Sequence, residues 1–427
     1  MSCQYLTRVN CPFFYVPSFS LRKSRGNWSD LALSSILTTK MADSMQSRTV
    51  KTRLLIVSDT HSHAPKKSKT SPFPDPIPRC DVFIHAGDMT NLGKKSELEQ
   101  VVDWIAKIEA ELKIVIAGNH DMELDAAFCR SQGSDRFQRE FTPAESLALF
   151  TSPSAVAAGI FYLCDETRSL TLSNGATFVV HGSPWQPVFC GWAFNYPHHL
   201  DRWNPASPID TLTTAIPDNV DILVTHGPPL GVFDTVINSG IDVGCPWLKL
   251  ALERVRPRLH VFGHIHESRG AGRIQWHPRE DEMHREKTAA LEAELRATAE
   301  LMDSKDRHRA FDNKVAELFK EHPVEQTLLL LPEPLEKPVL IQCTHLDVTS
   351  EAREGKGKGD INGVLRVGQE TLVINAAMMS RSMRPINPPF LVDLDLPVSA
   401  SFVQDVCAED GTSVKSSSSK DGSCSTI

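Results

Sequence analysis

Carboxylate, amide and imidazole side chains recur at the ends of short apolar runs in this sequence. Seven of them could supply oxygen and nitrogen ligands to metal: Asp59, His61, Asp88, Asn119, His226, His264 and His266. A mixed set without thiolate suits Mn²⁺, Fe²⁺ or Zn²⁺ better than a soft metal. Two ions about 3.5 to 4 Å apart, bridged by one carboxylate, would use all seven and could bind both the attacking and the leaving oxygen of a displacement. We therefore expect two divalent ions, Mn²⁺ first, with Fe²⁺ and Zn²⁺ as the alternatives.

The elements that must position these residues are short buried strands. Eight apolar or β-branched runs, most of about 4 to 8 residues and bounded by turn residues, have this pattern. They are 54–59, 82–88, 114–119, 177–181, 222–226, 260–264, 371–375 and 390–394. Helical spacing lies between several of them, as over 97–112. The alternation predicts an α/β domain whose strand ends, most with a glycine beside the candidate ligand, converge on one point.

The motifs around these residues are similar to those of a known superfamily. They are Asp59-Thr-His-Ser-His63, His85-Ala-Gly-Asp88, Gly118-Asn-His-Asp121, Gly182-Ser-Pro-Trp-Gln-Pro187, Thr225-His-Gly-Pro-Pro-Leu230, His260-Val-Phe-Gly-His-Ile-His-Glu267 and Ile374-Asn-Ala376. In this order they resemble the calcineurin-like metallophosphoesterases, in particular the metallophosphoesterase-domain-containing branch. The resemblance covers roughly 52–277 and 370–397. It implies two packed mixed β-sheets flanked by α-helices, with a dinuclear site at the strands' carboxyl edge.

The resemblance also implies a role for each candidate ligand. One metal would take Asp59, His61 and His266, the other Asn119, His226 and His264, and Asp88 would bridge them. The two ions would lower the pKa of a bridging water and give a hydroxide that attacks phosphorus in line. The implied catalytic residues are His120, which contacts the phosphate and protonates the leaving oxygen, and Asp121, which orients it.

The expected activity is hydrolysis of a phosphate ester. The resemblance favours a phosphodiester, including a cyclic nucleotide, over a phosphomonoester. The alternative class is a non-catalytic interaction scaffold that keeps the fold. Retention of every metal ligand together with His120 favours the enzyme, because a scaffold has no chemical need for them.

Several other side chains near these motifs have two interpretations. His181, in His-Gly-Ser-Pro, imitates His226-Gly-Pro-Pro and competes with it for one ligand position. His63 and His85 lie beside ligands, and we interpret them as hydrogen-bond partners rather than ligands. Asn375 is a candidate neighbour of the site. Trp185, Trp192 and Asn195 could line a substrate pocket or only pack their loop.

The motif positions predict one catalytic domain, over 52–397, with an insertion at about 278–368. The insertion holds two amphipathic patterns, one through Leu291 and Leu295 and one through Phe311 and Val315, which predict a helical hairpin. A linker that contains the Gly/Lys run 355–359 follows. We expect a disordered leader over 1–51 and a disordered Ser-rich tail over 398–427. The hairpin, over 278–321, is a solvent-facing surface or a partner-binding one.

Composition excludes several classes of protein. The chain has 45 basic and 53 acidic residues, a net charge of −8, and no basic patch for nucleic acid or anionic lipid. No apolar run approaches the roughly 20 residues that cross a bilayer. The ten scattered cysteines indicate reduced intracellular thiols. We therefore expect a cytoplasmic protein, with a mitochondrial transit peptide as the alternative for the mildly basic leader.

Overall fold

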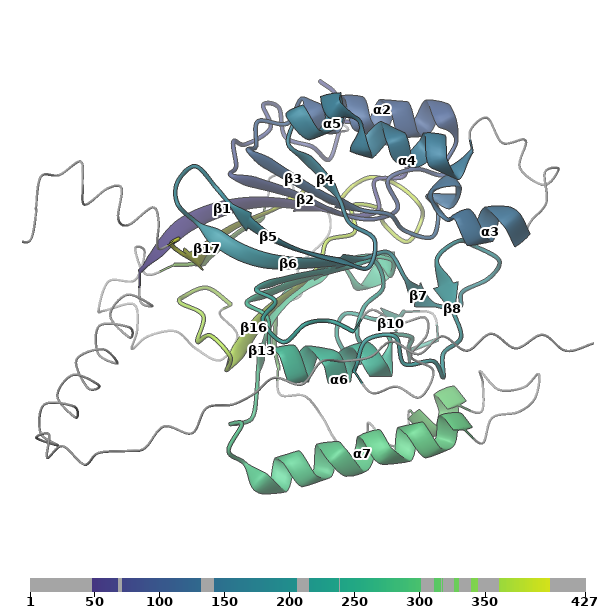
Figure 1. Ribbon diagram of the computed structural model, residues 1–427, viewed down its shortest axis with the longest axis vertical. Helices are drawn as coiled ribbons and strands as arrows, with labels where there is room; N and C mark the ends of the chain where they lie inside the picture. The colour runs from purple at the N-terminus through teal and green to yellow at the C-terminus, as the bar shows by residue number, and fades with distance from the viewer. Residues whose placement is uncertain are drawn as a thin grey trace, which may run out of the picture. The chain divides into compact units, whose positions relative to one another are not determined.

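Two mixed β-sheets form the centre of the computed structural model, which describes residues 48–67, 71–131, 142–205, 215–237, 239–300, 311–315, 317, 326–329, 339–344 and 361–399 (Figure 1). The first sheet has the order β15 (Val339–Cys343), β17 (Phe390–Pro397), β1 (Thr49–Val57), β2 (Val82–Ala86), β3 (Leu112–Ile116) and β4 (Ile160–Tyr162). The second has the order β14 (Gln326–Leu329), β13 (Gly270–Gln275), β16 (Glu370–Asn375), β12 (Leu259–Phe262), β9 (Ile222–Thr225), β6 (Thr177–Ser183) and β5 (Glu166–Thr171). The predicted fold of two mixed sheets with flanking helices is confirmed.

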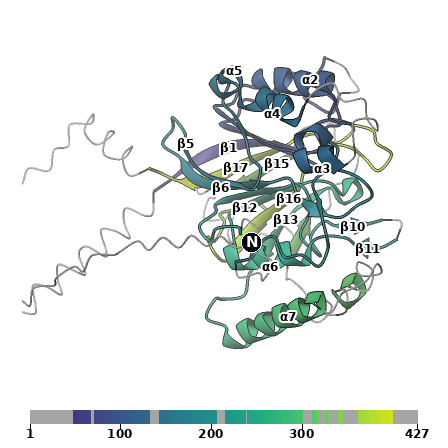
Figure 2. The ribbon, with the colours of Figure 1, turned by 45° about the vertical axis from the view of Figure 1, so that its right-hand side comes forward.

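Helices cover the outer face of each sheet (Figures 1 and 2). Over the first sheet lie α2 (Lys95–Ala106), α4 (Pro143–Thr151) and α5 (Pro153–Ala157). Beneath the second lie α6 (Pro246–Val255) and α7 (Glu282–Glu300). Short elements complete the edge that carries the site: η1 (Met122–Leu124), α3 (Ala126–Ser131), β7 (Gln186–Pro187), β8 (Asn195–Tyr196), β10 (Thr235–Val236), β11 (Ile241–Asp242) and η2 (His266–Ser268).

The central strands are mostly apolar because both of their faces are buried. In β1, Leu54 and Ile56 point into the core between the sheets, whereas Leu55 and Val57 pack toward α2 with Leu98. The second sheet likewise packs one face against the first sheet and the other face against its own helices. Successive side chains of a strand alternate between its faces, so a run without polar residues is the expected pattern here.

The eight predicted strands correspond to β1, β2, β3, β6, β9, β12, β16 and β17. The helix predicted over 97–112 is shorter than expected: α2 ends at Ala106, and Leu112 already begins β3. The apolar positions after Ala106 continue the helical spacing by coincidence. Ile108 is buried in the layer beside α2, and Leu112 is buried between the sheets.

The insertion contributes a helix and two strands, and the predicted hairpin is not shown. Its first helix is α7, in which Leu291 and Leu295 are buried and Arg296 forms the predicted pair with Glu292, 2.7 Å apart. Residues 311–315 are helical, but 301–310 lie outside the described residues, as does the Gly/Lys run 355–359. Strands β14 and β15 pair with β13 and β17, so this segment adds an edge strand to each sheet. Such short edge strands carry little periodicity for a sequence to reveal.

The ends of the domain meet on neighbouring strands. Thr49 pairs with Pro397 and Lys51 with Asp395, so the last three residues of the predicted leader belong to β1 instead. Ladder hydrogen bonds to β17 hold them in the sheet. The rest of the leader, 1–47, and the tail from 400 lie outside the described residues. No helix in the described part of the chain is long and apolar enough to cross a membrane.

Candidate metal centre

The candidate ligands gather where neighbouring strands of the two sheets end. Asp59, Asp88 and Asn119 follow β1, β2 and β3, which are parallel neighbours. His226 and His264 follow β9 and β12, a parallel pair of the second sheet. Because parallel strands end at the same edge of a sheet, the topology brings these side chains together.

The backbone is strained where four of these ligands project. Asp59, His61, Asp88 and His264 have φ angles of 52°, 41°, 51° and 68°. Positive φ is uncommon for residues other than glycine, and such residues cluster at functional sites. Here the positive φ angles turn the chain sharply just beyond the strands, where the side chains cluster at the sheet edge.

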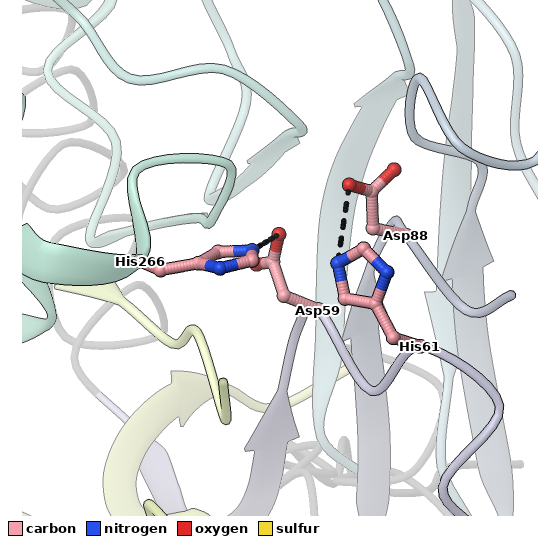
Figure 3. Close-up of side chains that lie close together, drawn as sticks. All are labelled: Asp59, His61, Asp88 and His266. Carbon is pink, nitrogen blue, oxygen red and sulfur yellow. Dashed lines mark hydrogen bonds and ion pairs between the residues drawn. The ribbon is translucent and has the colours of Figure 1, made fainter. Parts of the chain in front are cut away.

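One cluster consists of Asp59, His61, Asp88 and His266, whose potential ligand atoms all lie within 4.8 Å of one another. His266 Nε2 is 3.2 Å from Asp59 Oδ1, and His61 Nε2 is 3.7 Å from Asp88 Oδ2. Figure 3 shows His266 reaching in from the second sheet's side toward the three residues of the first. The cluster therefore joins both halves of the domain.

A second cluster consists of Asp88, His226 and His264, again within 4.8 Å. His226 Nε2 lies 3.4 Å from Asp88 Oδ1 and 3.0 Å from Asn119 Oδ1, which brings Asn119 to the same point. Asp88 is common to both clusters and faces His61 with one oxygen and His226 with the other. This arrangement suits a carboxylate shared by two ions.

The buried imidazoles fit a metal. Both ring nitrogens of His61 are buried and have no hydrogen-bond partner among the described residues. Burial lowers the pKa of His61 to about 4 and that of His264 to about 3. Both rings are therefore neutral at pH 7, the form that binds a metal. A buried polar atom without a partner is costly, and a metal bond would satisfy it.

The charges of the site also favour cations. Burial disfavours ionisation of Asp59, but the hydrogen bond and charge of His266 outweigh it and bring the pKa of Asp59 to about 2. Burial likewise disfavours a protonated His226, but the charge of Asp88 outweighs it and raises the pKa of His226 to about 9. Without metal, protonated histidines thus balance two buried carboxylates. Metal binding would displace those protons.

Glycines let the ligands approach the backbone closely. A Cβ added at Gly118 would lie 2.4 Å from Asp88 Oδ1 and 2.6 Å from His226 Cε1. One added at Gly263 would lie 2.1 Å from Asp59 Oδ2. A side chain at either position would occupy space that the ligands fill, which explains the Gly-Asn-His and Gly-His-Ile-His sequences.

His120 lies beside the first cluster. Its ring is 4.6 Å from the ring of His61, edge to face, and is stacked on Trp192 at 4.0 Å. Its Nδ1 is 2.7 Å from the backbone oxygen of Asn91. A carbonyl can only accept, so Nδ1 carries a proton and Nε2 is the ring nitrogen left for a substrate. No sequence motif marks Asn91, because it holds His120 through its backbone.

Asp121 is fully buried and organises the loops on either side. Its carboxylate accepts hydrogen bonds from the amides of Met89, Thr90 and Gly118 and from the Thr90 hydroxyl, at 2.7 to 3.2 Å. The ring of His120 is bonded to Asn91 instead. The contacts of Asp121 are thus those of a residue that ties the loop after β2 to the loop after β3.

Three other histidines beside the motifs each have one ring nitrogen in an ordinary hydrogen bond. His181 Nδ1 lies 2.8 Å from the Thr167 hydroxyl of β5, so His226 rather than His181 reaches the clusters. His85 Nε2 bonds Thr60, and His63 Nδ1 faces two backbone oxygens of its own loop. Asn375 donates from Nδ2 to the backbone oxygen of Ile265, between His264 and His266. None of the three histidines belongs to a metal-binding cluster in the described residues.

Comparison with known proteins agrees with this site. Residues 52–268 match the family model for calcineurin-like phosphoesterases, a span that includes both clusters. The chain belongs to this family. Calcineurin-like phosphoesterases are typically hydrolases with two metals, and the two adjacent Asp/His clusters of this member are its candidate dinuclear site.

Relatives match this calcineurin-like phosphoesterase over about half of its length. Metallophosphoesterase domain-containing protein 1 of Homo sapiens is 40% identical over 230 residues, which are 51% of this chain and 62% of that protein. UPF0046 protein T07D4.2 of Caenorhabditis elegans is 35% identical over 205 residues, which are 45% of this chain and 48% of that protein. Among solved structures, the phosphopantetheinyl hydrolase of Mycobacterium tuberculosis is 18% identical, with a TM-score of 0.33 over 51% of this chain and 83% of that one.

Proposed function

We propose that the protein is a metal-dependent phosphoesterase that hydrolyses a phosphodiester. Asp59, His61 and His266 would hold one divalent ion, and Asn119, His226 and His264 the other. Asp88 would hold both. The observation that carries the proposal is the position of Asp88, whose two oxygens face two different sets of candidate ligands.

The bound ions would lower the pKa of an attacking water and stabilise charge on the phosphoryl oxygens. The chain's own contribution is to hold and protonate the substrate. With Nδ1 of His120 fixed on Asn91, Nε2 would contact the phosphate and hold the proton that passes to the leaving oxygen. Trp192, stacked on the same ring, would restrict its rotation and keep water from one of its faces.

The family match supports an ester of phosphate as the substrate. The preference for a diester rests on the resemblance of the motifs to the metallophosphoesterase-domain-containing branch. Manganese as the native metal rests on the oxygen and nitrogen ligands, which Fe²⁺ and Zn²⁺ would also accept. Both refinements are open to direct measurement.

The test is turnover by the purified full chain, reconstituted with Mn²⁺, on bis(4-nitrophenyl) phosphate and on 4-nitrophenyl phosphate. We expect hydrolysis of the diester, loss of activity with a chelator, and recovery on adding metal. Asp88→Asn, which keeps the shape of the side chain and removes its charge, should be inactive. Preference for the monoester would overturn the diesterase, and a metal-free protein inactive on both esters would indicate a scaffold.

A further inference from the structure

The carboxylate of Glu97 lies at the start of α2 and accepts hydrogen bonds from the loop that follows β2. Its Oε1 accepts from the Ser62 hydroxyl at 2.7 Å and from the Asn91 amide at 3.1 Å. Its Oε2 accepts from the amides of Leu92 and Lys94, both at 3.1 Å. These bonds lower the pKa of Glu97 although its partial burial opposes ionisation. One ionised side chain thus fixes the loop 91–94.

Two short paths lead from Glu97 to the candidate metal centre. Ser62 follows His61 directly, and Asn91 Nδ2 donates to the backbone oxygen of His61 at 3.1 Å. The backbone oxygen of Asn91 accepts from Nδ1 of His120 at 2.7 Å. Asn91 is therefore bonded to Glu97 through its backbone amide and to His120 through its backbone carbonyl.

We propose that Glu97 is a positioning residue for His120. By fixing Asn91, it sets the direction of the carbonyl that orients the His120 ring and thereby where Nε2 lies. The role rests on the proposed function, in which Nε2 of His120 contacts the substrate. Glu97 is hydrogen-bonded to no metal-ligand side chain, and its link to His120 runs through Asn91.

A purely structural role for Glu97 would be helix capping, because it lies at the third position of α2 and accepts from the Lys94 amide. Helix α4 offers a matched control. Glu145 holds the same position there and accepts from the Thr142 amide at 2.8 Å. Its other bond is to the Thr142 hydroxyl, which is not part of the candidate site. Removing either carboxylate removes a capping hydrogen bond from one helix, but only Glu97 also accepts a hydrogen bond from Asn91.

The experiment compares Glu97→Ala, Glu97→Gln and Glu145→Ala in the full chain loaded with Mn²⁺. We measure kcat and KM on bis(4-nitrophenyl) phosphate, together with bound metal. We expect Glu97→Ala to lower kcat by about 10- to 100-fold, since misplacing a catalytic group by about 1 Å can cost that much. KM should change by less than about twofold, because the proton transfer proposed for His120 occurs in the transition state. Glu97→Gln, with one oxygen left, should fall between, and Glu145→Ala should keep wild-type turnover.

A second readout is independent of activity. In the metal-free protein, amide hydrogen exchange of the segment 89–94 should be faster in Glu97→Ala than in wild type and unchanged in Glu145→Ala. Equal kcat in Glu97→Ala and Glu145→Ala, or unchanged exchange, would overturn the role of Glu97 while the wild type remains active. A wild type inactive on both ester types would instead overturn the proposed function, and the role of Glu97 with it.

Discussion

Gly263→Ala should weaken metal binding although it adds only one methyl group. The new Cβ would lie 2.1 Å from Asp59 Oδ2 and 2.7 Å from Ser58 Cβ, whereas real Cβ atoms do not approach other atoms closer than 3.0 Å. Ser58 cannot yield by a side-chain rotation, since its Cβ belongs to the backbone frame. Asp59 cannot turn away without losing the His264 amide, 3.1 Å from both of its oxygens, and His266.

The size of the effect follows from this geometry. Asp59 Oδ2 must retreat from 2.1 Å to at least 3.0 Å, whereas ligand distances in metal sites tolerate about 0.2 Å. Changes that misorient a single ligand typically cost 10- to 100-fold in metal affinity, so we expect a loss of about that size or more. The backbone φ of Gly263 is not positive, so the clash itself is the cause.

The assay is titration of metal-free protein with Mn²⁺ in competition with a chelating dye. Gly191→Ala is the control, because it makes the same chemical change on the neighbouring loop at a position with nothing within 4 Å of the added Cβ. Gly191→Ala should bind metal as the wild type does. If Gly263→Ala also retained wild-type affinity, the Asp59 carboxylate would not be the ligand we propose.

Three further predictions concern residues around the site and in the sheet. His120→Ala should keep its metal and lose about 100- to 10,000-fold in kcat on a diester; unchanged turnover would remove His120 from the mechanism. Asp121→Asn places an amide group opposite backbone N–H donors, so it should lower the free energy of unfolding by about 1 to 3 kcal/mol and should also lower metal affinity. If both quantities kept their wild-type values while kcat fell, Asp121 would instead orient His120 directly. Burial opposes ionisation of Asp393, but the hydrogen bonds of Arg53 at 2.7 and 2.8 Å outweigh it and hold its pKa below the ordinary value. The pair therefore stabilises the fold above about pH 3.9 and does so less as the pH falls. In urea unfolding, Asp393→Asn should lower the free energy of unfolding by about 1 kcal/mol at pH 7, a figure reduced for the exposure of Arg53, and by progressively less toward pH 3. A loss of stability that does not depend on pH would exclude this cause.

The clustering of the candidate ligands could be predicted from the sequence because most of them follow closely on the end of a buried strand. A strand buried on both faces is an apolar run, and the polar residue that ends it is conspicuous, as Asp59 is after β1. Parallel pairing then brings the ends together without any knowledge of side-chain contacts. His226 could be separated from His181 by its place in the motif order and by the Gly-Pro-Pro that follows it. The structure agrees, since His226 belongs to a cluster and His181 faces Thr167.

The parts that could not be predicted depend on backbone groups and on edges. Asn91 orients His120 through a carbonyl that every residue possesses, so no residue type marks the position. Glu97 looks like an ordinary helix-capping residue, and its link to the site exists only through the folded loop. Strands β14 and β15 are short and lie at the edges of their sheets, within a segment whose charged helix dominates the pattern.

The most direct test of the account is the number of metal ions that the protein binds. We would load the full chain with Mn²⁺, remove free metal by gel filtration, and count ions per chain by mass spectrometry in wild type and in Asp88→Asn. Since Asp88 faces both clusters, we predict two ions in the wild type and at most one in the variant. One ion or none in the wild type, or two in Asp88→Asn, would contradict a dinuclear centre that shares this carboxylate.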